Sequence, residues 1–438
     1  MSRKRRSELQ VVHPECAGID IGSASHFVAV DPARSTQPVR CFDSFTDDLE
    51  AMAKWLRECG VTLVAMESTG VYWIPVYEVL ERFGFEVHLV DPRATKQVSG
   101  RKSDVLDCQW IRQLMSHGLL KGAFRPDVGT CELRAYVRQR ARLGQDLSRT
   151  IQHMQKALTE MNVQLANVIS DITGKTGMQI LRAIVAGERD GEVLARYRHR
   201  RIKADEAAIA RSLRGTWHEE HLFALHQALA RYDFFAEQIR QCEARIIAHV
   251  DTRLGESDGS SRLRSWDSRM RERLQQLLGV DLTSIPTIGV ETALVFAAEV
   301  GPDLSRFPSS AHFCSWLTLA PPTRISGGKR LSGRIRTPVN RLGQALRVAA
   351  STARSSESFI GATHRARLSR LDKGRAIKAT AHQLARLIYA LLTEGTPYVE
   401  KGIEHFESAR RKRRIRALQR NARQLGFSVQ QNPIASVG

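Results

Sequence analysis

The sequence predicts an α/β domain at the N-terminus followed by an all-α region. Up to about residue 120, short apolar runs of four to seven residues alternate with turns and helix-length spacers. Apolar residues then recur in steps of three and four along two long segments, which is the period of packed helices. The last third combines short helical segments with loops rich in Gly, Pro, Ser and Arg.

The N-terminal runs read as strands of one mixed sheet. They are AGIDIG, HFVAV, CFDSF, VTLVAME and EVHLVD. Helices are expected over residues 49–59 and 72–83, which separate the later strands. Strands joined by helices of this length favour a sheet with helices packed on it, so this block is assigned to the α/β class.

Two long helices with coiled-coil seams are expected between residues 130 and 255. The first seam is Leu147, Ile151, Met154, Leu158, Met161, Leu165 and Val168, and the second is Leu222, Leu225, Leu229, Tyr232, Ala236 and Ile239. A shorter helical connection containing Gly174, Gly177 and Gly187 joins them. The seams can pack within one chain or against a second copy, and the pattern does not choose between these alternatives.

The remaining boundaries follow from composition. Residues 258–269 are polar and rich in Ser and Gly. A basic stretch, RRKRRIRALQRNAR, lies near the C-terminus and is expected to be a phosphate-facing helix or a solvated tail. The sequence therefore divides into segments 14–125, 130–255, 274–400 and 401–438.

Charge is the most unusual property of the composition. The 438 residues include 66 Lys and Arg against 46 Asp and Glu, a net charge of +20, so a polyanion such as nucleic acid is the expected partner. Seven scattered cysteines without a C-x-x-C pair argue against a disulfide framework or a zinc site. No apolar run reaches the length of a membrane span or a secretory signal, so a soluble, cytoplasmic protein is expected.

Four acids form a candidate metal site. Asp20 lies inside an apolar strand-like run, and Glu67 ends another. Asp104 and Asp107 stand three residues apart at the start of an expected helix, where they share one face. Carboxylates that converge in this way repel one another unless Mg²⁺ or Mn²⁺ compensates them, and two such ions can stabilise the attacking and leaving oxygens of a phosphodiester displacement. Taken singly, the acids can equally be turn residues, surface charges or helix-dipole partners.

A serine lies in a basic, glycine-containing segment of the last third. Ser326 precedes Gly327-Gly328 and lies between Arg324 and the pair Lys329 and Arg330, ahead of a helix expected from about residue 339. A serine on such a loop can reach a phosphate, and the cations can stabilise the transition state of attack by its oxygen. Ser-Gly-Gly is also a common turn sequence, so the segment carries weight only together with the acids.

The chain resembles the DEDD transposases of the IS110 class of bacterial insertion sequences, which are also described as bridge-RNA-guided serine recombinases. The stretches that carry the resemblance are GIDIGSASH, AMESTGVYW, LVDPRATKQVSGRKSDVLDCQW, SIPTIGVETA, LAPPTRISGGKRLSGRIRTPVNR and AIKATAHQLARLIYALL. They extend from about residue 14 to about residue 405.

The resemblance implies a ribonuclease-H-like (RuvC-like) first domain, a coiled-coil segment and a C-terminal transposase domain. It implies that Asp20, Glu67, Asp104 and Asp107 bind Mg²⁺ and that Ser326 is the nucleophile, which forms a phosphoserine link before strand exchange and religation by a 3′-hydroxyl. It also implies a guide RNA and a dimer or tetramer whose active site combines acids and serine from different protomers. Contacts of Arg324, Lys329, Arg330, Arg334 and Arg347 with nucleic acid are expected.

The sequence departs from the family pattern around the serine. The family often has G-L-x-P before the serine loop and G-N-x-x-L-R after it, where this chain has Thr318-Leu319-Ala320-Pro321 and Val339-Asn340-Arg341. This departure weakens the transfer of a role to Arg347 but leaves Ser326 in register.

The sequence therefore predicts a Mg²⁺-dependent DNA transposase or recombinase that acts on its element ends and target. One alternative is a resolvase-like junction nuclease in which metal-activated water cleaves DNA and Ser326 is structural. The other is a non-catalytic basic protein that binds nucleic acid.

Overall fold

A computed structural model describes residues 10–68, 70–90, 104–255, 265–320, 325–327, 329–330, 340–395 and 402–430. The chain forms two compact units, Met1–Arg125 and Pro126–Gly438. Each unit has a hydrophobic core of its own. None of the described helices is long and apolar enough to cross a membrane, and all seven cysteines are free.

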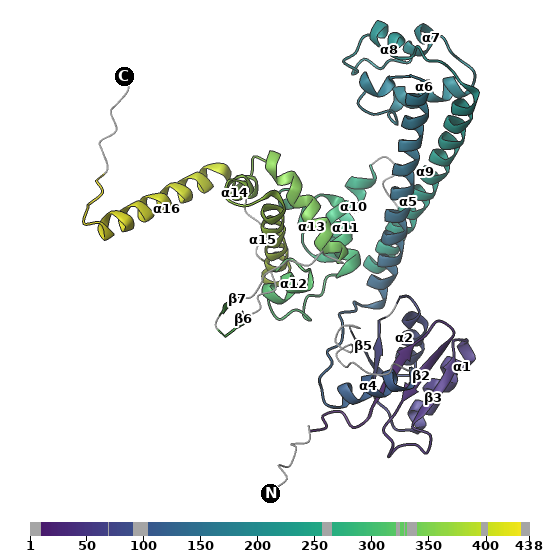
Figure 1. Cartoon of the computed structure of the whole chain (residues 1–438), viewed down its shortest axis with the longest axis vertical. Helices are drawn as coiled ribbons and strands as arrows, with labels where there is room; N and C mark the ends of the chain where they lie inside the picture. Colours follow the sequence, from purple (N-terminus) through teal and green to yellow (C-terminus); the bar gives the residue numbers. More distant parts are fainter. Residues whose placement is uncertain are drawn as a thin grey trace. The chain divides into compact units, whose positions relative to one another are not determined.

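A mixed five-stranded sheet forms the centre of the first unit (Figure 1). Its strands are β1 (Cys16–Ile21), β2 (Ser25–Ala29), β3 (Val39–Asp43), β4 (Leu63–Glu67) and β5 (Glu86–Val90). Their order is β3-β2-β1-β4-β5, in which β1, β4 and β5 are parallel to one another and β2 is antiparallel to both of its neighbours. This topology confirms the predicted mixed sheet and is consistent with a ribonuclease-H-like domain.

Successive side chains of a strand point to opposite faces of the sheet, and apolar side chains occur on both faces here. Helices therefore cover both faces. Ala17, Ile19 and Ile21 pack in one cluster with α1 (Thr46–Glu58) and α2 (Trp73–Arg82). On the opposite face, Cys16 and residues of β4 pack with α4 (Asp104–Ser116). The third strand begins and ends two residues earlier than the run CFDSF, because its register with β2 pairs Val39 with Ala29 and Asp43 with Ser25.

An antiparallel pair of long helices opens the second unit (Figure 1). Helices α5 (Val128–Glu160) and α9 (Glu219–Leu254) pack against each other along their length. The two predicted apolar seams are therefore partly buried within one molecule. The Nη2 atom of Arg140 lies 2.9 Å from Oε1 of Glu243 across this pair. At the open end, Nη2 of Arg253 donates to Oδ1 of Asp127, the N-cap of α5, at 3.1 Å.

The first predicted seam is too long at its C-terminal end. Helix α5 ends at Glu160, and Asn162 adopts a φ of 56°, which turns the chain away from the helix. Leu165 instead lies in the short helix η1 (Leu165–Asn167), and Val168 follows it. Both residues pack into a cluster at the tip with α6 (Lys175–Val185), α7 (Gly191–Ala195) and α8 (Glu206–Ser212). The apolar repeat therefore continues beyond the end of α5, because Leu165 and Val168 pack into this cluster.

A helical group forms the rest of the second unit. Its described elements are α10 (Trp266–Leu278), η2 (Leu282–Ser284), α11 (Val290–Glu299), α12 (Ser310–Trp316), β6 (Ile325–Ser326), β7 (Lys329–Arg330), α13 (Arg341–Thr352), η3 (Ala353–Ser355), α14 (Phe359–Leu368), α15 (Lys373–Glu394) and α16 (Gly402–Gln424). Phe313 is fully buried among the rings of Phe296, Phe307, Trp316 and Tyr389. The basic stretch near the C-terminus is helical and largely exposed.

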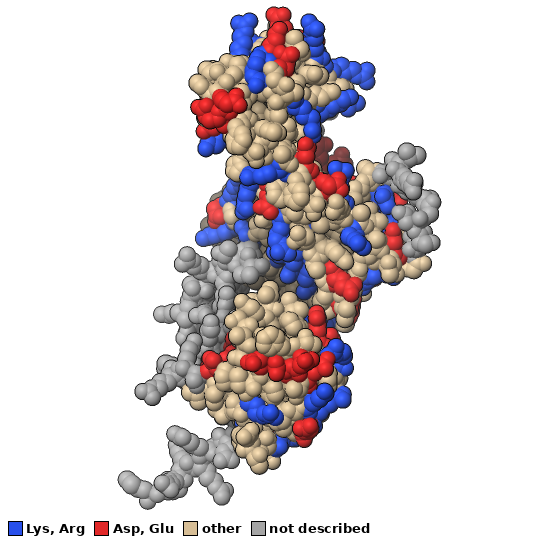
Figure 2. Space-filling view, turned by 90° about the vertical axis from the view of Figure 1, so that its right-hand side faces the viewer, with Lys and Arg blue, Asp and Glu red and all other residues tan. Residues whose placement is uncertain are grey.

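Lys and Arg side chains are spread over the surface. On the face drawn in Figure 2, basic residues occur at many places among the acidic ones and do not gather into a single stripe. Residues 1–125 contain 16 Lys and Arg and 16 Asp and Glu, so the net positive charge of the chain belongs to residues 126–438. Individual binding sites have to be found from the surroundings of particular side chains.

Candidate active site

Asp20 and Glu67 meet at one edge of the sheet. Asp20 lies near the carboxyl end of β1, and Glu67 is the last residue of β4. The parallel register pairs Ile19 with Met66, so the next position on each strand is one of the two acids. Because side chains alternate along a strand, both acids lie on the α4 face, opposite the cluster that contains Ile19 and Met66. Each is partly buried.

A glycine brings α4 to this edge. A Cβ atom on Gly18 would lie 2.3 Å from the backbone nitrogen of Arg112 and 2.4 Å from the carbonyl oxygen of Cys108. Any other residue would push α4 away from the strand, since backbone atoms cannot yield like the end of a side chain. The close approach places the first turn of α4, with Asp104 and Asp107, beside Asp20.

The electrostatics of Asp20 link the four acids. Burial, followed by the negative charges of Asp107, Asp104 and Glu67 in that order, raises the pKa of Asp20 to about 6. The thiol of Cys108, on the inner face of α4, has a pKa raised to about 12 by burial and then by the charge of Asp20. The structure thus brings the other three predicted acids within electrostatic reach of Asp20.

The donor set suits a hard divalent cation. It contains only carboxylate oxygens, and its uncompensated negative charge is what a Mg²⁺ or Mn²⁺ ion neutralises. Among the described residues, however, no three Asp, Glu, His or Cys side chains are already arranged to hold a metal ion. Electrostatic repulsion acts over longer distances than coordination, so the acids lie near one another without forming a finished cage.

The predicted serine lies in the second unit. Ser326 ends β6 and pairs with Lys329 of β7, and Gly327 between them has a φ of 56°, the left-handed conformation that favours glycine. The backbones of Lys329 and Arg330 belong to β7, whereas Arg324 and Arg334 lie outside the described residues. The helix expected from about residue 339 begins at Arg341, after the side chain of Asn340 caps it.

Arg347 has a basic neighbour that sequence reasoning missed. Its Nη1 atom donates to Oε1 of Gln344 at 3.3 Å, and its buried Nε atom has no hydrogen-bond partner. Burial and the charge of Arg347 lower the pKa of Lys378, which is buried in α15. The sequence offers one sign of this neighbour: Lys378 is a single lysine on the apolar face of a helix. Charged residues are rare at such positions, so the side chain is expected to have a role.

Two family models match the chain. A model of DEDD transposases of the IS110 type, described as a transposase, matches residues 17–163. A second model, described as the transposase IS116/IS110/IS902 family, matches residues 280–365. The first match contains the four acids, and the second contains Ser326 and Arg347. No curated protein matches the chain.

Proposed function

The chain belongs to the IS110 family of transposases, and on this premise we propose that it cleaves and rejoins DNA through Ser326, with Mg²⁺ or Mn²⁺ held by Asp20, Glu67, Asp104 and Asp107. Family membership makes the protein a DNA transposase, so DNA is its partner. DEDD transposase domains typically depend on divalent metal ions. The observation that carries the finer proposal is the coupling of Asp20 to the other three acids.

The four acids would act together on the phosphate. Their side chains would close around the cation, which supplies positive charge to the phosphate oxygens and to the oxygen that attacks or leaves. Asp20 and Glu67 are held by adjacent strands, and Asp104 and Asp107 by the helix that Gly18 admits. Such a rigid frame limits the reorganisation needed during the reaction.

Ser326 would supply the covalent step. Its Oγ atom would lose its proton and attack phosphorus, forming an ester between the serine and the 5′-phosphate. The bond from phosphorus to the 3′-oxygen would break, and that oxygen would take up a proton and leave as a hydroxyl. The reverse attack by a 3′-hydroxyl on the exchanged strand would restore the phosphodiester and the free serine. Arg324, Lys329, Arg330 and Arg334 would hold the phosphate backbone near the serine.

Five further features belong to this proposal. A guide RNA from the element would direct the protein to its target, and a dimer or tetramer would assemble acids and serine from different protomers. The segments 14–125, 130–255, 274–400 and 401–438 would be the ribonuclease-H-like domain, the coiled coil, the transposase domain and a basic tail. Arg347, next to Lys378 in the helical group, would contact nucleic acid. The protein would act in the bacterial cytoplasm, at the nucleoid.

Covalent capture of DNA tests this proposal. The protein is incubated with labelled element-end DNA, RNA from the element and Mg²⁺, then denatured and separated on a gel. We expect protein-linked DNA that is lost in Ser326→Ala and in Asp20→Asn. Ser332→Ala is the matched control, because Ser332 lies in the same basic segment, and it should retain the link.

Each other result contradicts the proposal in a different way. Cleavage without a link, unchanged in Ser326→Ala but abolished in Asp20→Asn, would identify a resolvase-like nuclease. Binding without cleavage in the presence of Mg²⁺ would leave a non-catalytic nucleic-acid-binding protein.

A further inference from the structure

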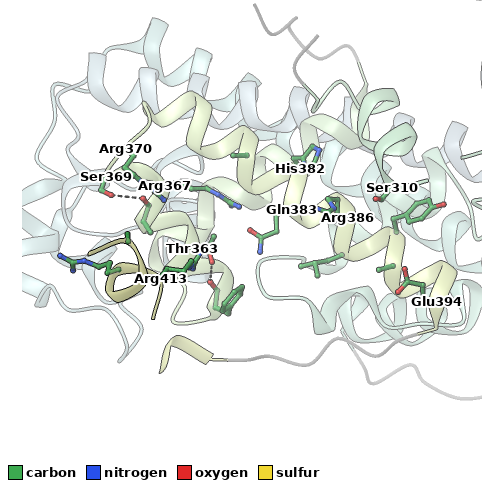
Figure 3. Close-up of a pocket in the computed structure, with 18 residues that line it drawn as sticks. Ser310, Thr363, Arg367, Ser369, Arg370, His382, Gln383, Arg386, Glu394 and Arg413 are labelled. Atoms are coloured by element: carbon green, nitrogen blue, oxygen red, sulfur yellow. Dashed lines mark hydrogen bonds between the residues drawn. The ribbon is translucent and has the colours of Figure 1, made fainter. Parts of the chain in front are cut away.

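An arginine-lined cavity lies among α14, α15 and α16, in the second unit (Figure 3). Its volume is about 980 Å³. The arginines that line it are Arg367 of α14, Arg370 in the turn after that helix, Arg386 of α15, and Arg413 and Arg414 of α16. One acid, Glu394, is among the lining residues. The cavity therefore carries a large excess of positive charge, which predicts an anionic occupant.

Four of the five arginines form no ion pair with the part of the chain that the structure describes. These four are Arg367, Arg370, Arg386 and Arg414. Arg367 donates to Oγ1 of Thr380 at 2.9 Å, and burial lowers its pKa, which shows that the surroundings oppose its charge. Arg367 is half-buried, and burying a cation without a carboxylate costs free energy that a bound anion would offset.

A buried acceptor lies between the arginines. Figure 3 places Gln383 in the middle of the cavity, with Arg367 to one side and Arg386 to the other. Its Oε1 atom is buried and has no hydrogen-bond partner. A backbone phosphodiester has no donor that would satisfy this acceptor, whereas buried polar atoms in proteins are almost always paired. The occupant therefore needs a donor as well as negative charge.

Aromatic side chains complete the lining. Phe359 and Tyr389 also border the cavity. Phosphates, an amino group and a flat ring are combined in a nucleotide. The cavity volume is at the upper end of the range of about 300 to 1,000 Å³ typical of small-ligand sites.

We propose that this cavity, named here the arginine pocket, binds an unpaired nucleotide of a nucleic-acid strand. Arg367, Arg386 and Arg414 hold its phosphates, and Gln383 accepts a hydrogen bond from an amino group of its base. The base has to be unpaired, because in a duplex its amino group is engaged and its ring is stacked. The choice of nucleic acid over another anion rests on family membership. The pocket contains none of the residues proposed for cleavage, so it is a separate site.

Binding assays on the full chain test the arginine pocket without any cleavage. The double variant Arg386→Ala/Arg414→Ala removes two exposed pocket cations. The matched control is Arg416→Ala/Arg420→Ala, which removes the same charge from exposed positions of α16 that do not line the pocket. Fluorescence anisotropy with labelled DNA and RNA single strands, and with duplex DNA, is measured in EDTA over a range of salt concentrations.

We expect the pocket double variant to lose about tenfold in affinity for a single strand, with the control losing about twofold. For the pocket double variant, the magnitude of the slope of log K against log salt should be about 1.4 smaller than for the wild type, since about 0.7 is expected for each phosphate contact of a single strand. Gln383→Leu should weaken single-strand binding about threefold and leave the salt slope unchanged, because it removes a hydrogen bond but no charge. The strand type that shows the selective loss, DNA or RNA, identifies the natural source.

Several results would overturn the proposal. One is an equal loss in the pocket and control double variants, which would make the arginines part of a general positive surface. Another is a loss on duplex DNA as large as that on single strands. A third is stabilisation of the wild type by inorganic phosphate while no oligonucleotide distinguishes the two double variants. Because all assays contain EDTA, failure here leaves the covalent capture experiment unaffected, and failure of that experiment leaves this one intact.

Discussion

Asp20 is held where its negative charge is unfavourable in the metal-free protein. It is partly buried on β1, and three further acids act on it. A folded-state pKa of about 6, above the ordinary value of 3.8, means that the folded protein favours the protonated carboxyl. The contribution of Asp20 to stability is therefore fully present below about pH 4 and is lost as the pH rises through about 6. A bound cation would stabilise the charged form of this carboxyl group, which the metal-free protein disfavours.

Replacement of Asp20 by Asn should stabilise the metal-free protein near neutral pH. We expect Asp20→Asn to raise the free energy of unfolding by about 1 to 2 kcal/mol at about pH 7.5, less than the full shift implies because the side chain is partly solvated. The gain should vanish at about pH 4, where the wild-type carboxyl is also protonated. Urea denaturation in EDTA at both pH values measures the difference. A variant that is less stable than the wild type at both pH values would contradict this account.

Gly18 determines whether α4 can reach the sheet. Gly18→Ala places a methyl group 2.3 Å from the backbone nitrogen of Arg112. We expect a loss of about 2 to 4 kcal/mol in unfolding free energy, together with loss of cleavage, because the helix has to move away from the strand. Gly144→Ala is the control, since nothing lies within 4 Å of a Cβ atom there in helix α5. It should stabilise the protein by about 0.5 to 1 kcal/mol. Thermal denaturation measures the change in stability of both variants. Equal changes for Gly18→Ala and Gly144→Ala would contradict the packing argument.

At the scale of elements, an ion pair between a buried carboxylate and a half-buried guanidinium joins the long helices to the helical group. Both ends of the Arg138 guanidinium donate to the carboxylate of Glu299, Nε to Oε1 at 2.8 Å and Nη2 to Oε2 at 2.7 Å. Arg134 adds hydrogen bonds to the carbonyl oxygens of Ala298 and Glu299. Helix α11 is thereby fixed to the first half of α5, and the second unit holds together across a large separation in sequence.

Neutralising Glu299 should loosen this junction. Glu299→Gln leaves Arg138 without a charged partner, and we expect the unfolding free energy to fall by about 2 to 4 kcal/mol. The control Asp146→Asn breaks an exposed pair with Arg149 on α5 and should cost less than about 1 kcal/mol. Chemical denaturation of the two variants compares the losses. A loss for Glu299→Gln no larger than that of the control would show that the junction relies on apolar packing alone.

For the whole molecule, the net charge of +20 predicts strong dependence of nucleic-acid binding on salt. The logarithm of the association constant should fall linearly with the logarithm of salt concentration, with a slope of about −0.9 for each phosphate contacted on duplex DNA. Titrations of labelled DNA at several salt concentrations measure the slope. An oligonucleotide of the same sequence with an uncharged backbone serves as the control and should show almost no slope. A flat dependence on natural DNA would argue against phosphate contacts as the main source of affinity.

Periodicity and strand ends were enough to predict the classes of the elements, the mixed sheet and the approximate positions of the acids. They could not predict that α4 touches the backbone at Gly18, because that contact depends on packing between distant segments. The C-terminal end of α5 could not be predicted either. The apolar repeat continues to Leu165, which is buried although Asn162 has already turned the chain away from the helix. The arginine pocket combines three helices, so no local spacing reveals it. Lys378 gave a signal only as an isolated charge on an apolar face.

The clamp between Asp127 and Arg253 has a consequence for how this protein can vary in length. The chain enters the helical hairpin and leaves it at the same end, where α11 also packs on α5 and α10 on α9. The distal part of the hairpin and its tip therefore form a cassette beyond this anchored end. Deleting one heptad from each helix would shorten the cassette by about 10 Å and return both ends to the same anchor. The reach of the tip is therefore adjustable in evolution or by engineering while the rest of the second unit keeps its fold.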